Sequence, residues 1–465
     1  KVKVISYTQK LDHFGYQSDL SNFTFQQRLV VEDARWAGAK AGAPIFALLG
    51  EYNGLSYPPS EFGILSLSAI EFKAMLIQIE QRFYGNSIPL GSIDLAMADH
   101  RLRACLSTKQ TLQDFADIIQ SLKKNLSAHN SPVIVAGMGY WGALATWFRM
   151  KYPHITIGAL ASSTPLLYYG SSSPGHGYCH IVSNDFKLIT ESWVVIDEIS
   201  SQHDGLAKLS KYFNTCRPLQ SVEELKQPLA QLYSSTAQFD LPGNPEIKSL
   251  CLEVLRKHNF TIEALVEVLY KLVVGKCFDA NISTTINMYS PFEPLSNETL
   301  AWAWQRCNEL IYPIGCVRQS MLPSQPFHMA EFKRSCQERF GITPHPHLLA
   351  SFFENHTMLD YLVQFGGNII FSNGLKDPFC SGAILKSLST TITAITTKGS
   401  YCWDMHEVKN DDPKWLKENR EKELKIFGQW INEFHHTSKA YKPLAYSVMI
   451  CVVVELIIIT CTIWM

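Results

Sequence analysis

The sequence predicts an α/β protein, in which a parallel sheet is covered by helices and interrupted by a mostly helical insertion. In the first third of the chain, short apolar runs alternate with segments whose apolar residues recur at helical spacing. Similar apolar runs return only near the C-terminal end, after a long stretch that contains few of them. We therefore expect a sheet domain divided into residues 1–169 and 366–438, with a helical cap insertion at 170–365.

Five runs in the first third have the composition of strands, with apolar residues that end in polar residues or glycine. They span 23–31, 44–49, 75–79, 133–136 and 155–161. Leu112, Phe115 and Ile119 belong to a helix-spaced pattern over 111–128, and a second helix is expected at 142–151. Strands and helices in alternation are typical of a parallel sheet with two buried faces.

The rest of the chain completes this organisation. Helical periodicity occurs at 218–233, 246–257 and 262–273, inside the expected insertion. Two further strands are expected at 368–374 and 391–397, followed by a closing amphipathic helix at 414–435. The last strands of the sheet therefore come after the insertion.

Composition excludes several classes of protein. The 465 residues are 46% apolar, which is enough to bury a large core and argues against disorder. The 41 basic and 42 acidic residues give a formal charge of −1 without a long basic run, so we expect no nucleic-acid partner. The chain has no Cys-x-x-Cys pair, and we expect neither a metal nor a cofactor.

Sequons and cysteines favour the secretory pathway. Six Asn-x-Ser/Thr sequons are present, at Asn22, Asn125, Asn259, Asn281, Asn297 and Asn355. The 12 cysteines are then expected to form disulfides, although a buried reduced thiol is the alternative for some of them. We expect a glycoprotein of an extracellular, vacuolar or lysosomal compartment.

The chain ends in an apolar segment, 444–465, that is long enough to span a bilayer. Glu455 lies in its middle and disfavours insertion by about 2.5–3.5 kcal/mol. A C-terminal membrane anchor is the leading interpretation. A cleaved anchor-attachment signal, a buried tail and an error in the gene model are the alternatives.

The most informative stretch is VIVAGMGYWGALATWFRMKYPH at 133–154. An expected strand runs into Gly137, a sharp turn follows, and a helix begins near Gly142. This is the shape of the nucleophile elbow Gly-x-Ser-x-Gly, in which a serine at the tip attacks a carbonyl. Here the tip is Gly139, which has no side chain and cannot attack.

Two other interpretations fit these glycines. An ordinary Gly-rich turn between a strand and a helix requires no chemistry. The spacing of Gly137, Gly139 and Gly142 also matches a dinucleotide-binding pattern. That pattern belongs to the first strand of a sheet and needs an acidic residue about 20 positions later, and neither condition is met.

Several motifs together resemble one peptidase family. They are YTQKLDHF (7–14), EQRFYGNSIP (80–89), WFRMKYPH (147–154), GALASSTP (158–165), NIIFSNGLKDP (368–378) and DPKWL (412–416). From Tyr7 to about Phe434, the chain resembles the serine exopeptidases that include lysosomal Pro-X carboxypeptidase, dipeptidyl-peptidase II and thymus-specific serine protease, especially their plant members. The resemblance implies an α/β-hydrolase fold with a helical cap. It also implies removal of residues from peptide ends next to proline by Ser, Asp and His, in that chain order.

Two of the three catalytic positions that the resemblance implies are substituted. The aspartate falls on Asp377, but the nucleophile falls on Gly139 and the base on Tyr401. The reaction needs a hydroxyl activated by an imidazole, and the carboxylate only orients that imidazole. A tyrosine with a pKa of about 10 is a poor general base. We therefore expect a catalytically impaired protein that still binds a peptide or protein with proline near an end.

An active prolyl exopeptidase that uses an unrecognised nucleophile is the alternative. Ser162 and Ser163 end a different expected strand, the Cys402 side chain is expected to point away from the base position, and His406 lies further along the chain. A third hypothesis is a pseudogene-like product without a stable role, which the apolar tail and the altered cysteine pattern favour.

The resemblance also marks residues beside the triad. The Tyr140 N–H is one candidate oxyanion donor, and Gly50-Glu51 after an expected strand is the candidate for the second, with a plain turn as the alternative. Phe379 follows the aspartate and is expected either to line a proline pocket or to be a core aromatic.

One motif departs from the family pattern. Gln81 stands where relatives usually have histidine, so that contact is altered. Its neighbours Glu80 and Arg82 are expected to form a buried ion pair rather than to bind substrate.

By resemblance, the plausible disulfides are Cys216 with Cys251 and Cys316 with Cys336. Relatives have a cysteine at the position of Trp193 that would bond Cys307, so Cys307 is either free or bonded to Cys179. Because homodimers occur among the relatives, a homodimer is a further hypothesis.

Overall fold

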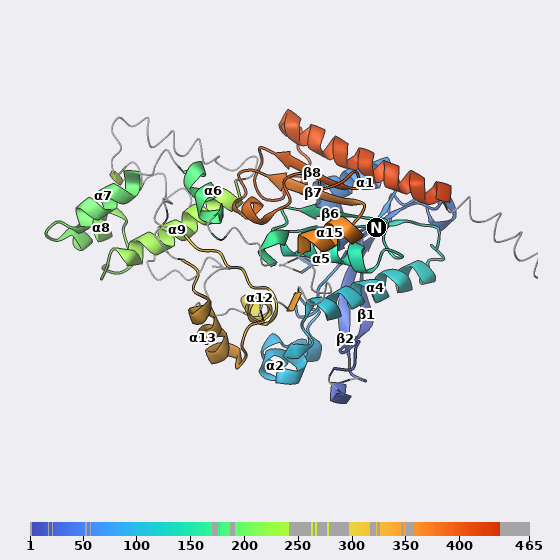
Figure 1. Cartoon of the computed structure of the whole chain (residues 1–465), viewed down its shortest axis with the longest axis horizontal. Coiled ribbons are helices and arrows are strands. Elements are labelled where there is room, and N and C mark those ends of the chain that lie inside the picture. The colour runs from blue at the N-terminus through green and yellow to red at the C-terminus, as the bar shows by residue number, and fades with distance from the viewer. Residues whose placement is uncertain are drawn as a thin grey trace, which may run out of the picture.

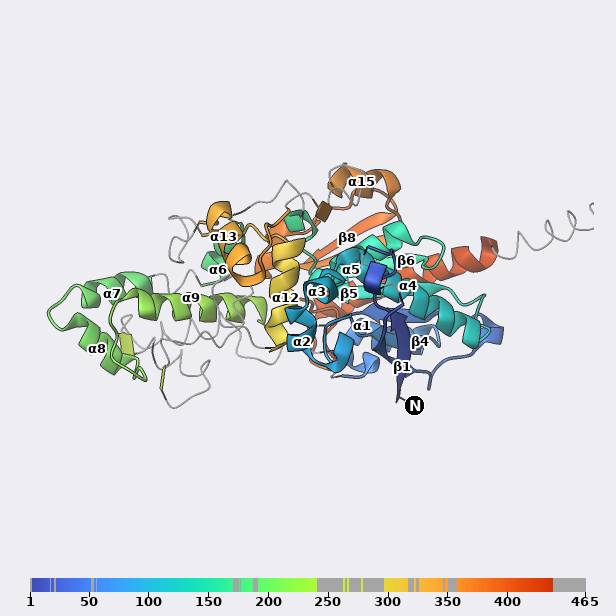
Figure 2. The ribbon, with the colours of Figure 1, turned by 90° about the horizontal axis from the view of Figure 1, so that it is seen from below.

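The computed structural model shows a central sheet with helices on both faces, and further helices that extend away from one end (Figures 1 and 2). The structure describes residues 2–16, 18–20, 22–51, 54–55, 57–169, 175, 177–186, 191–240, 262–263, 266, 277–278, 297–316, 322, 326–345, 348–349 and 358–437.

In this part of the chain the sheet has eight strands, in the order β1-β2-β4-β3-β5-β6-β7-β8. They are β1 (Val2–Lys10), β2 (Thr24–Glu32), β3 (Ile45–Leu49), β4 (Met75–Ile79), β5 (Val133–Met138), β6 (Gly158–Ser162), β7 (Ile369–Gly374) and β8 (Ile392–Thr397). From β4 to β8 all neighbours are parallel, whereas β2 is antiparallel to both β1 and β4. The carboxyl ends of β5, β7 and β8 therefore share one edge of the sheet, where ligands bind in folds of this kind.

Helices bury both faces of the sheet. One face packs on α4 (Thr108–Asn125) and α5 (Tyr140–Lys151), and the other on α1 (Gly63–Glu71) and the helix over 414–437, which is red in Figure 1. Along β3, Ala47 joins the same core as Phe115 of α4, whereas its neighbour Phe46 joins the core of Phe427. This alternation explains the continuous apolar run, because every residue of β3 is buried.

Between β6 and β7 the described chain is mostly helical. It contains α6 (Gly177–Asp185), α7 (Glu191–Ser200), α8 (Gly205–Tyr212), α9 (Glu223–Gln238), α12 (Asn297–Asn308), α13 (Met329–Phe340) and α15 (Met358–Phe365). Figures 1 and 2 show α7 and α8 far from the sheet, whereas α12 packs beside α2 (Ile93–Ala98), which is followed by α3 (His100–Ala104). Short 3₁₀ helices lie at Ser18–Leu20, Ala39–Ala41, Pro59–Glu61, Pro89–Gly91, Leu166–Tyr169 and Pro378–Gly382.

Most of the predicted strands are confirmed. β4 has the predicted bounds, and β2, β3, β5, β7 and β8 differ from the predicted ranges by one or two residues at an end. The sheet is parallel except at one edge, where β2 is antiparallel to both β1 and β4. β1 itself is not among the predicted strands, because most of its side chains are exposed. The expected helix at 246–257 lies outside the described residues.

A buried ion pair fixes the N-terminal segment, with a different partner from the predicted one. The Arg82 guanidinium donates to both carboxylate oxygens of Asp114, at 2.6 and 2.7 Å, and to the Leu11 carbonyl at 2.8 Å. Glu80 instead accepts from the Ser87 hydroxyl at 2.6 Å. The predicted Glu80–Arg82 pair is therefore wrong, because Asp114 on α4 offers two oxygens to the guanidinium fork.

Three disulfides join cysteines of the described residues. Cys179 bonds Cys316, Cys216 bonds Cys277, and Cys307 bonds Cys336. The predicted pairs Cys216–Cys251 and Cys316–Cys336 are therefore wrong, and so are both alternatives for Cys307.

The observed pairs follow from the packing of the insertion. α13 packs on α12 and brings Cys336 to Cys307, with 5.5 Å between their Cα atoms. A backbone bridge between Thr215 and Phe278 brings the residues next to them, Cys216 and Cys277, together. Neither contact leaves a signal in the local sequence.

Within the described ranges, the structure has no helix that is both long and apolar enough to cross a membrane. The segment 444–465 lies outside those ranges, and so do Asn259, Asn281 and Asn355. Of the other sequons, Asn22 and Asn125 are exposed, as a glycosylation site must be, and Asn297 begins α12. The anchor and the glycans stay predictions.

Candidate active site

The turn between β5 and α5 has the backbone of a nucleophile elbow. Gly139 stands alone between the strand and the helix, with φ of 54° and ψ of −119°. Glycine adopts this positive φ freely, whereas other residues are strained there. The Gly139 N–H donates to the Ser162 carbonyl at 2.9 Å, so the tip is fixed to the end of β6.

Close packing explains the glycines on either side of the tip. A Cβ at Gly137 would lie 2.1 Å from the Trp141 carbonyl oxygen, and one at Gly142 would lie 1.9 Å from Thr164 Oγ1. Both distances are far shorter than van der Waals contact. The two glycines therefore allow α5 to fold back closely on β5, as the elbow requires.

Tyr401, which follows β8, lies directly over the tip. Its hydroxyl oxygen would be 2.5 Å from a Cβ at Gly139, and its ring atoms Cζ and Cε2 would be 3.4 and 3.5 Å away. The fold thus brings together the nucleophile and base positions that the resemblance implied. Burial raises the pKa of the Tyr401 hydroxyl well above its usual value, so the phenol stays protonated.

The third position, Asp377, follows β7 and is fully buried. Its Oδ1 accepts a hydrogen bond from the Phe379 N–H at 3.0 Å. Burial outweighs this hydrogen bond and raises the pKa of Asp377 to about 8. The carboxyl is therefore mainly neutral at pH 7, and position 401 offers it no imidazole to orient.

The two candidate oxyanion donors differ in whether their N–H groups already have a hydrogen-bond partner. Tyr140 is the first residue of α5, so its N–H has no carbonyl four residues earlier to bond within the helix. The Gly50 N–H donates to the Ile79 carbonyl at 2.8 Å, and the expectation for Gly50 is therefore wrong. Gly50 has a packing role instead, since a Cβ there would lie 1.9 Å from the Trp141 ring.

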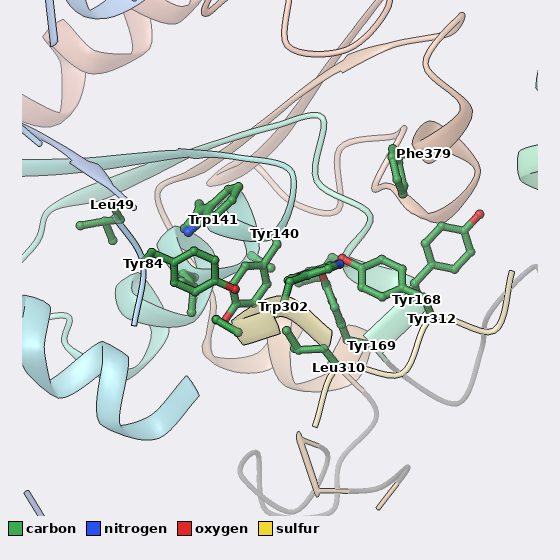
Figure 3. Close-up of a cluster of buried hydrophobic side chains, with 14 of the residues drawn as sticks. Leu49, Tyr84, Tyr140, Trp141, Tyr168, Tyr169, Trp302, Leu310, Tyr312 and Phe379 are labelled. Carbon is green, nitrogen blue, oxygen red and sulfur yellow. The ribbon is translucent and has the colours of Figure 1, made fainter. Parts of the chain in front are cut away.

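Aromatic side chains gather beside the elbow, as Figure 3 shows. We call Tyr140, Trp141, Tyr168, Tyr169, Tyr178, Trp302, Tyr312 and Phe379 the aromatic cluster. The ring centroids of Tyr140 and Trp302 are 5.3 Å apart, and Phe379 lies 5.3 Å from Tyr178 and 6.4 Å from Tyr401. Because Trp302 belongs to α12 and Tyr178 to α6, the cluster joins the sheet to the helices that follow β6.

A glutamine of α12 also contacts the elbow, and sequence reasoning missed it. Gln305 accepts from the Tyr84 hydroxyl at 2.6 Å, and its amide donates to the Tyr140 hydroxyl at 2.8 Å. Gln81, the residue that departs from the family pattern, accepts from the Trp141 indole at 2.8 Å. Gln305 and Tyr140 are 165 positions apart in the chain, so no local pattern marks their contact.

Side chains considered as replacement nucleophiles have other contacts. The Ser162 hydroxyl donates to Asp404 at 2.5 Å, and the Ser163 hydroxyl accepts the Cys402 N–H at 2.7 Å. Burial raises the pKa of the Cys402 thiol well above its usual value, which disfavours the thiolate. His406 contacts the main-chain carbonyl of Tyr401 at 3.3 Å.

The strand order, the elbow after β5 and the triad positions after β7 and β8 define the class of protein as an α/β hydrolase. A family model described as Serine carboxypeptidase S28 matches residues 9–423. The chain therefore belongs to the serine carboxypeptidase S28 family, and the resemblance seen in its motifs is confirmed.

Curated relatives are similar over most of their length. Lysosomal Pro-X carboxypeptidase of Homo sapiens is 30% identical over 465 aligned positions, which cover 94% of this chain and 89% of the relative. Thymus-specific serine protease of Mus musculus is 26% identical, over 88% of this chain and 84% of the relative. Among solved structures, proline iminopeptidase from Mycobacterium smegmatis covers 93% of this chain and 100% of its own, with 10% identity and a TM-score of 0.36.

Proposed function

We propose that this protein binds peptides with proline near one end and does not hydrolyse them. The pairing of Gly139 with Tyr401 carries the proposal. The nucleophile position has no side chain, and a phenol fills the base position, 2.5 Å from where a Cβ on residue 139 would lie. Serine-type hydrolysis needs an attacking hydroxyl and an imidazole that takes its proton, and residues 139 and 401 supply neither.

Protonation states support the loss of hydrolysis. The pKa of Tyr401 is raised by burial, and the pKa of Asp377 is raised to about 8, so neither side chain is a base at acidic or neutral pH. The Ser162 hydroxyl donates to Asp404, and the Ser163 hydroxyl accepts from the Cys402 N–H, so both hydroxyls are already hydrogen-bonded. An exopeptidase with another nucleophile therefore has no specific observation in its favour.

The aromatic cluster supports the binding part of the proposal. The rings of Tyr140 and Trp302 are 5.3 Å apart beside the elbow, and the ring of Phe379 lies 6.4 Å from Tyr401, which covers the elbow tip. All three rings are buried, so a peptide end would meet their edges next to the tip. Proline-containing segments are commonly recognised by aromatic surfaces, because the ring of proline is apolar and rigid. A relative is named a Pro-X carboxypeptidase, and we extend that preference to the ligand of this chain.

We further propose that the protein functions in the secretory pathway. Three disulfides are formed in its described residues, and disulfides persist in oxidising compartments. One relative is named as lysosomal. Recovery of the full chain from eukaryotic cells, with and without detergent, tests the proposed anchor at 444–465, and sedimentation of the recovered protein tests the proposed homodimer.

Binding and turnover are measured on the same secreted, full-length sample. Calorimetric titration compares a peptide that ends in Pro-Phe with a matched peptide that ends in Ala-Phe, and mass spectrometry follows both peptides from acidic to neutral pH. We expect the proline peptide to bind more tightly and both peptides to stay intact. Product formation in proportion to the amount of protein contradicts the loss of hydrolysis, and equal or absent binding contradicts the preference for proline.

The double variant Gly139→Ser/Tyr401→His provides the complementary measurement. It restores both groups that the reaction needs and keeps Asp377, so we expect turnover in the double variant and in neither single variant. Turnover in Gly139→Ser alone would mean that Tyr401 does not prevent hydrolysis. Turnover in Tyr401→His alone would mean that the chain has a nucleophile other than residue 139.

A further inference from the structure

One side chain of the aromatic cluster has a polar group without a partner. Trp302 of α12 lies at the centre of the cluster (Figure 3), with its ring centroid 5.3 Å from that of Tyr140 and 5.8 Å from that of Tyr312. The residue is only 7% exposed, and its indole N–H has no acceptor within the described ranges. A buried donor without a partner is unfavourable, so this position favours an acceptor that a ligand supplies.

The other tryptophan in the second half of α12 has a satisfied indole. Trp304 Nε1 donates to the Leu106 carbonyl at 3.3 Å, and its ring packs on Phe340 and Arg103. Residues two positions apart lie about 200° apart around a helix, so the two indoles leave α12 on opposite sides. Trp304 therefore attaches the helix to its surroundings, whereas Trp302 faces the aromatic cluster.

Buried hydrogen bonds hold the helix of Trp302 against the sheet domain. Gln305, one turn after Trp302, donates to the Tyr140 hydroxyl at 2.8 Å. Just after the end of α12, Glu309 accepts from the N–H and the hydroxyl of Thr108, at 2.6 and 2.8 Å. These bonds join α12 to the first residues of both α5 and α4. The indole is thus held in place before a ligand arrives, which lowers the entropy cost of binding.

Tyr140 connects this indole to the elbow. It is the first residue of α5 and follows Gly139, the tip of the turn, directly in the chain. Because the rings of Tyr140 and Trp302 are neighbours, a ligand that passes Tyr140 on its way to the tip comes next to Trp302. The free N–H therefore lies on the side of the elbow where the aromatic cluster gathers.

We propose that Trp302 determines the specificity of the peptide site, by donating its indole N–H to the carbonyl oxygen of the amide that precedes proline in the ligand. This inference rests on the proposed function. The nitrogen of that amide belongs to the proline ring, so the amide has an acceptor and no N–H. It uses the free donor of Trp302 and adds no donor of its own. Alanine in place of proline adds an N–H that needs a further acceptor.

The test removes each partner of this hydrogen bond in turn. Calorimetric titration of the full-length secreted chain compares the peptide Gly-Ala-Pro-Phe with an isostere in which a trans alkene replaces the Ala–Pro amide. The alkene keeps the shape of the amide and lacks the carbonyl oxygen. We expect the wild type to bind the amide about tenfold more tightly than the alkene, as the loss of one buried hydrogen bond implies.

Two variants of α12 make the comparison specific. Trp302→Phe keeps an aromatic ring without the N–H, so its affinities for the two peptides should agree within about twofold. Trp304→Phe removes an indole that is already bonded to Leu106, and should prefer the amide as the wild type does. A purely structural role of Trp302 would weaken both peptides equally and leave the preference for the amide unchanged in Trp302→Phe.

That unchanged preference would overturn the proposal, and so would equal binding of the two peptides by the wild type. If Trp302→Phe does not fold, the wild-type comparison decides. Wild-type protein that binds neither Gly-Ala-Pro-Phe nor the alkene contradicts the proposed function as well. Wild-type protein that binds both equally contradicts only the role of Trp302.

Discussion

The Tyr401 hydroxyl occupies the space that a side chain on residue 139 would need, since a Cβ at Gly139 would lie 2.5 Å from the phenol oxygen. Residues 139 and 401 are therefore coupled by packing. While Tyr401 is present, glycine at the tip of the elbow avoids a clash.

This coupling predicts that Gly139→Ser alone is destabilising. A side chain at φ of 54° and against Tyr401 combines backbone strain with overpacking, each of about 1–3 kcal/mol. Tyr401→Phe removes the contacting oxygen and keeps the ring, so Gly139→Ser/Tyr401→Phe should recover part of the loss. Urea unfolding of the four proteins measures the coupling free energy. Strictly additive effects would mean that the hydroxyl does not contact residue 139 in solution.

A second prediction concerns the ion pair that fixes the N-terminal segment. Arg82 and Asp114 are both fully buried, so Arg82→Met leaves the Asp114 carboxylate with the His13 ring as its remaining ion-pair partner and should cost about 3–5 kcal/mol of unfolding free energy. The partly exposed pair of Arg101 with Asp99 is the matched control, and Arg101→Met should cost less than about 1 kcal/mol. Equal effects of the two variants in urea unfolding would contradict the buried pair.

Stability should also depend on the ionisation of Glu309. Its carboxylate accepts hydrogen bonds from the Thr108 N–H at 2.6 Å and the Thr108 hydroxyl at 2.8 Å, at the start of α4. Burial nevertheless raises the pKa of Glu309 to about 7, from an ordinary value of 4.5. Because the folded chain holds this proton more tightly, the stabilisation from Glu309 is complete below about pH 4.5 and is lost as pH rises through 7.

Glu309→Gln removes this titration. Relative to the variant, the wild type should lose up to roughly 3 kcal/mol of unfolding free energy between acidic pH and pH 8. Urea unfolding of both proteins across this range measures the difference. Parallel curves for the two proteins would show that Glu309 has an ordinary pKa in the folded chain.

The disulfide between Cys307 and Cys336 gives a fourth prediction. It closes a loop of 29 positions, so Cys307→Ala/Cys336→Ala should lower the unfolding free energy by about 3–4 kcal/mol. Peptide mapping without reduction should recover the Cys307 peptide bonded to the Cys336 peptide. A Cys316 peptide bonded to the Cys336 peptide would instead support the pairing that the family resemblance implied.

The sequence predicted those parts of the fold that leave a local pattern. β4 is a short apolar run between polar turns, and its bounds were predicted without error, whereas β1 was missed because its exposed residues lack such a run. The elbow was predicted because its glycines lie within six positions of one another, at Gly137, Gly139 and Gly142. A backbone shape of this kind depends on neighbours in the chain.

Contacts between distant segments were not predictable in this way. Arg82 bonds Asp114 instead of Glu80, and the Gly50 N–H bonds Ile79 instead of remaining available as an oxyanion donor. Both outcomes depend on which strand or helix lies next to the residue. The contact between Tyr401 and Gly139 was implied by family resemblance, but its closeness, which couples the two substitutions, appears only in the three-dimensional arrangement.

Labelling with a fluorophosphonate, followed by peptide mapping, tests most directly whether the chain has lost its hydrolytic chemistry while keeping the fold. We predict no labelled residue in the wild-type chain, and labelling at position 139 in Gly139→Ser/Tyr401→His. A labelled residue anywhere in the folded wild-type chain would reveal a working nucleophile and contradict the proposed loss of activity.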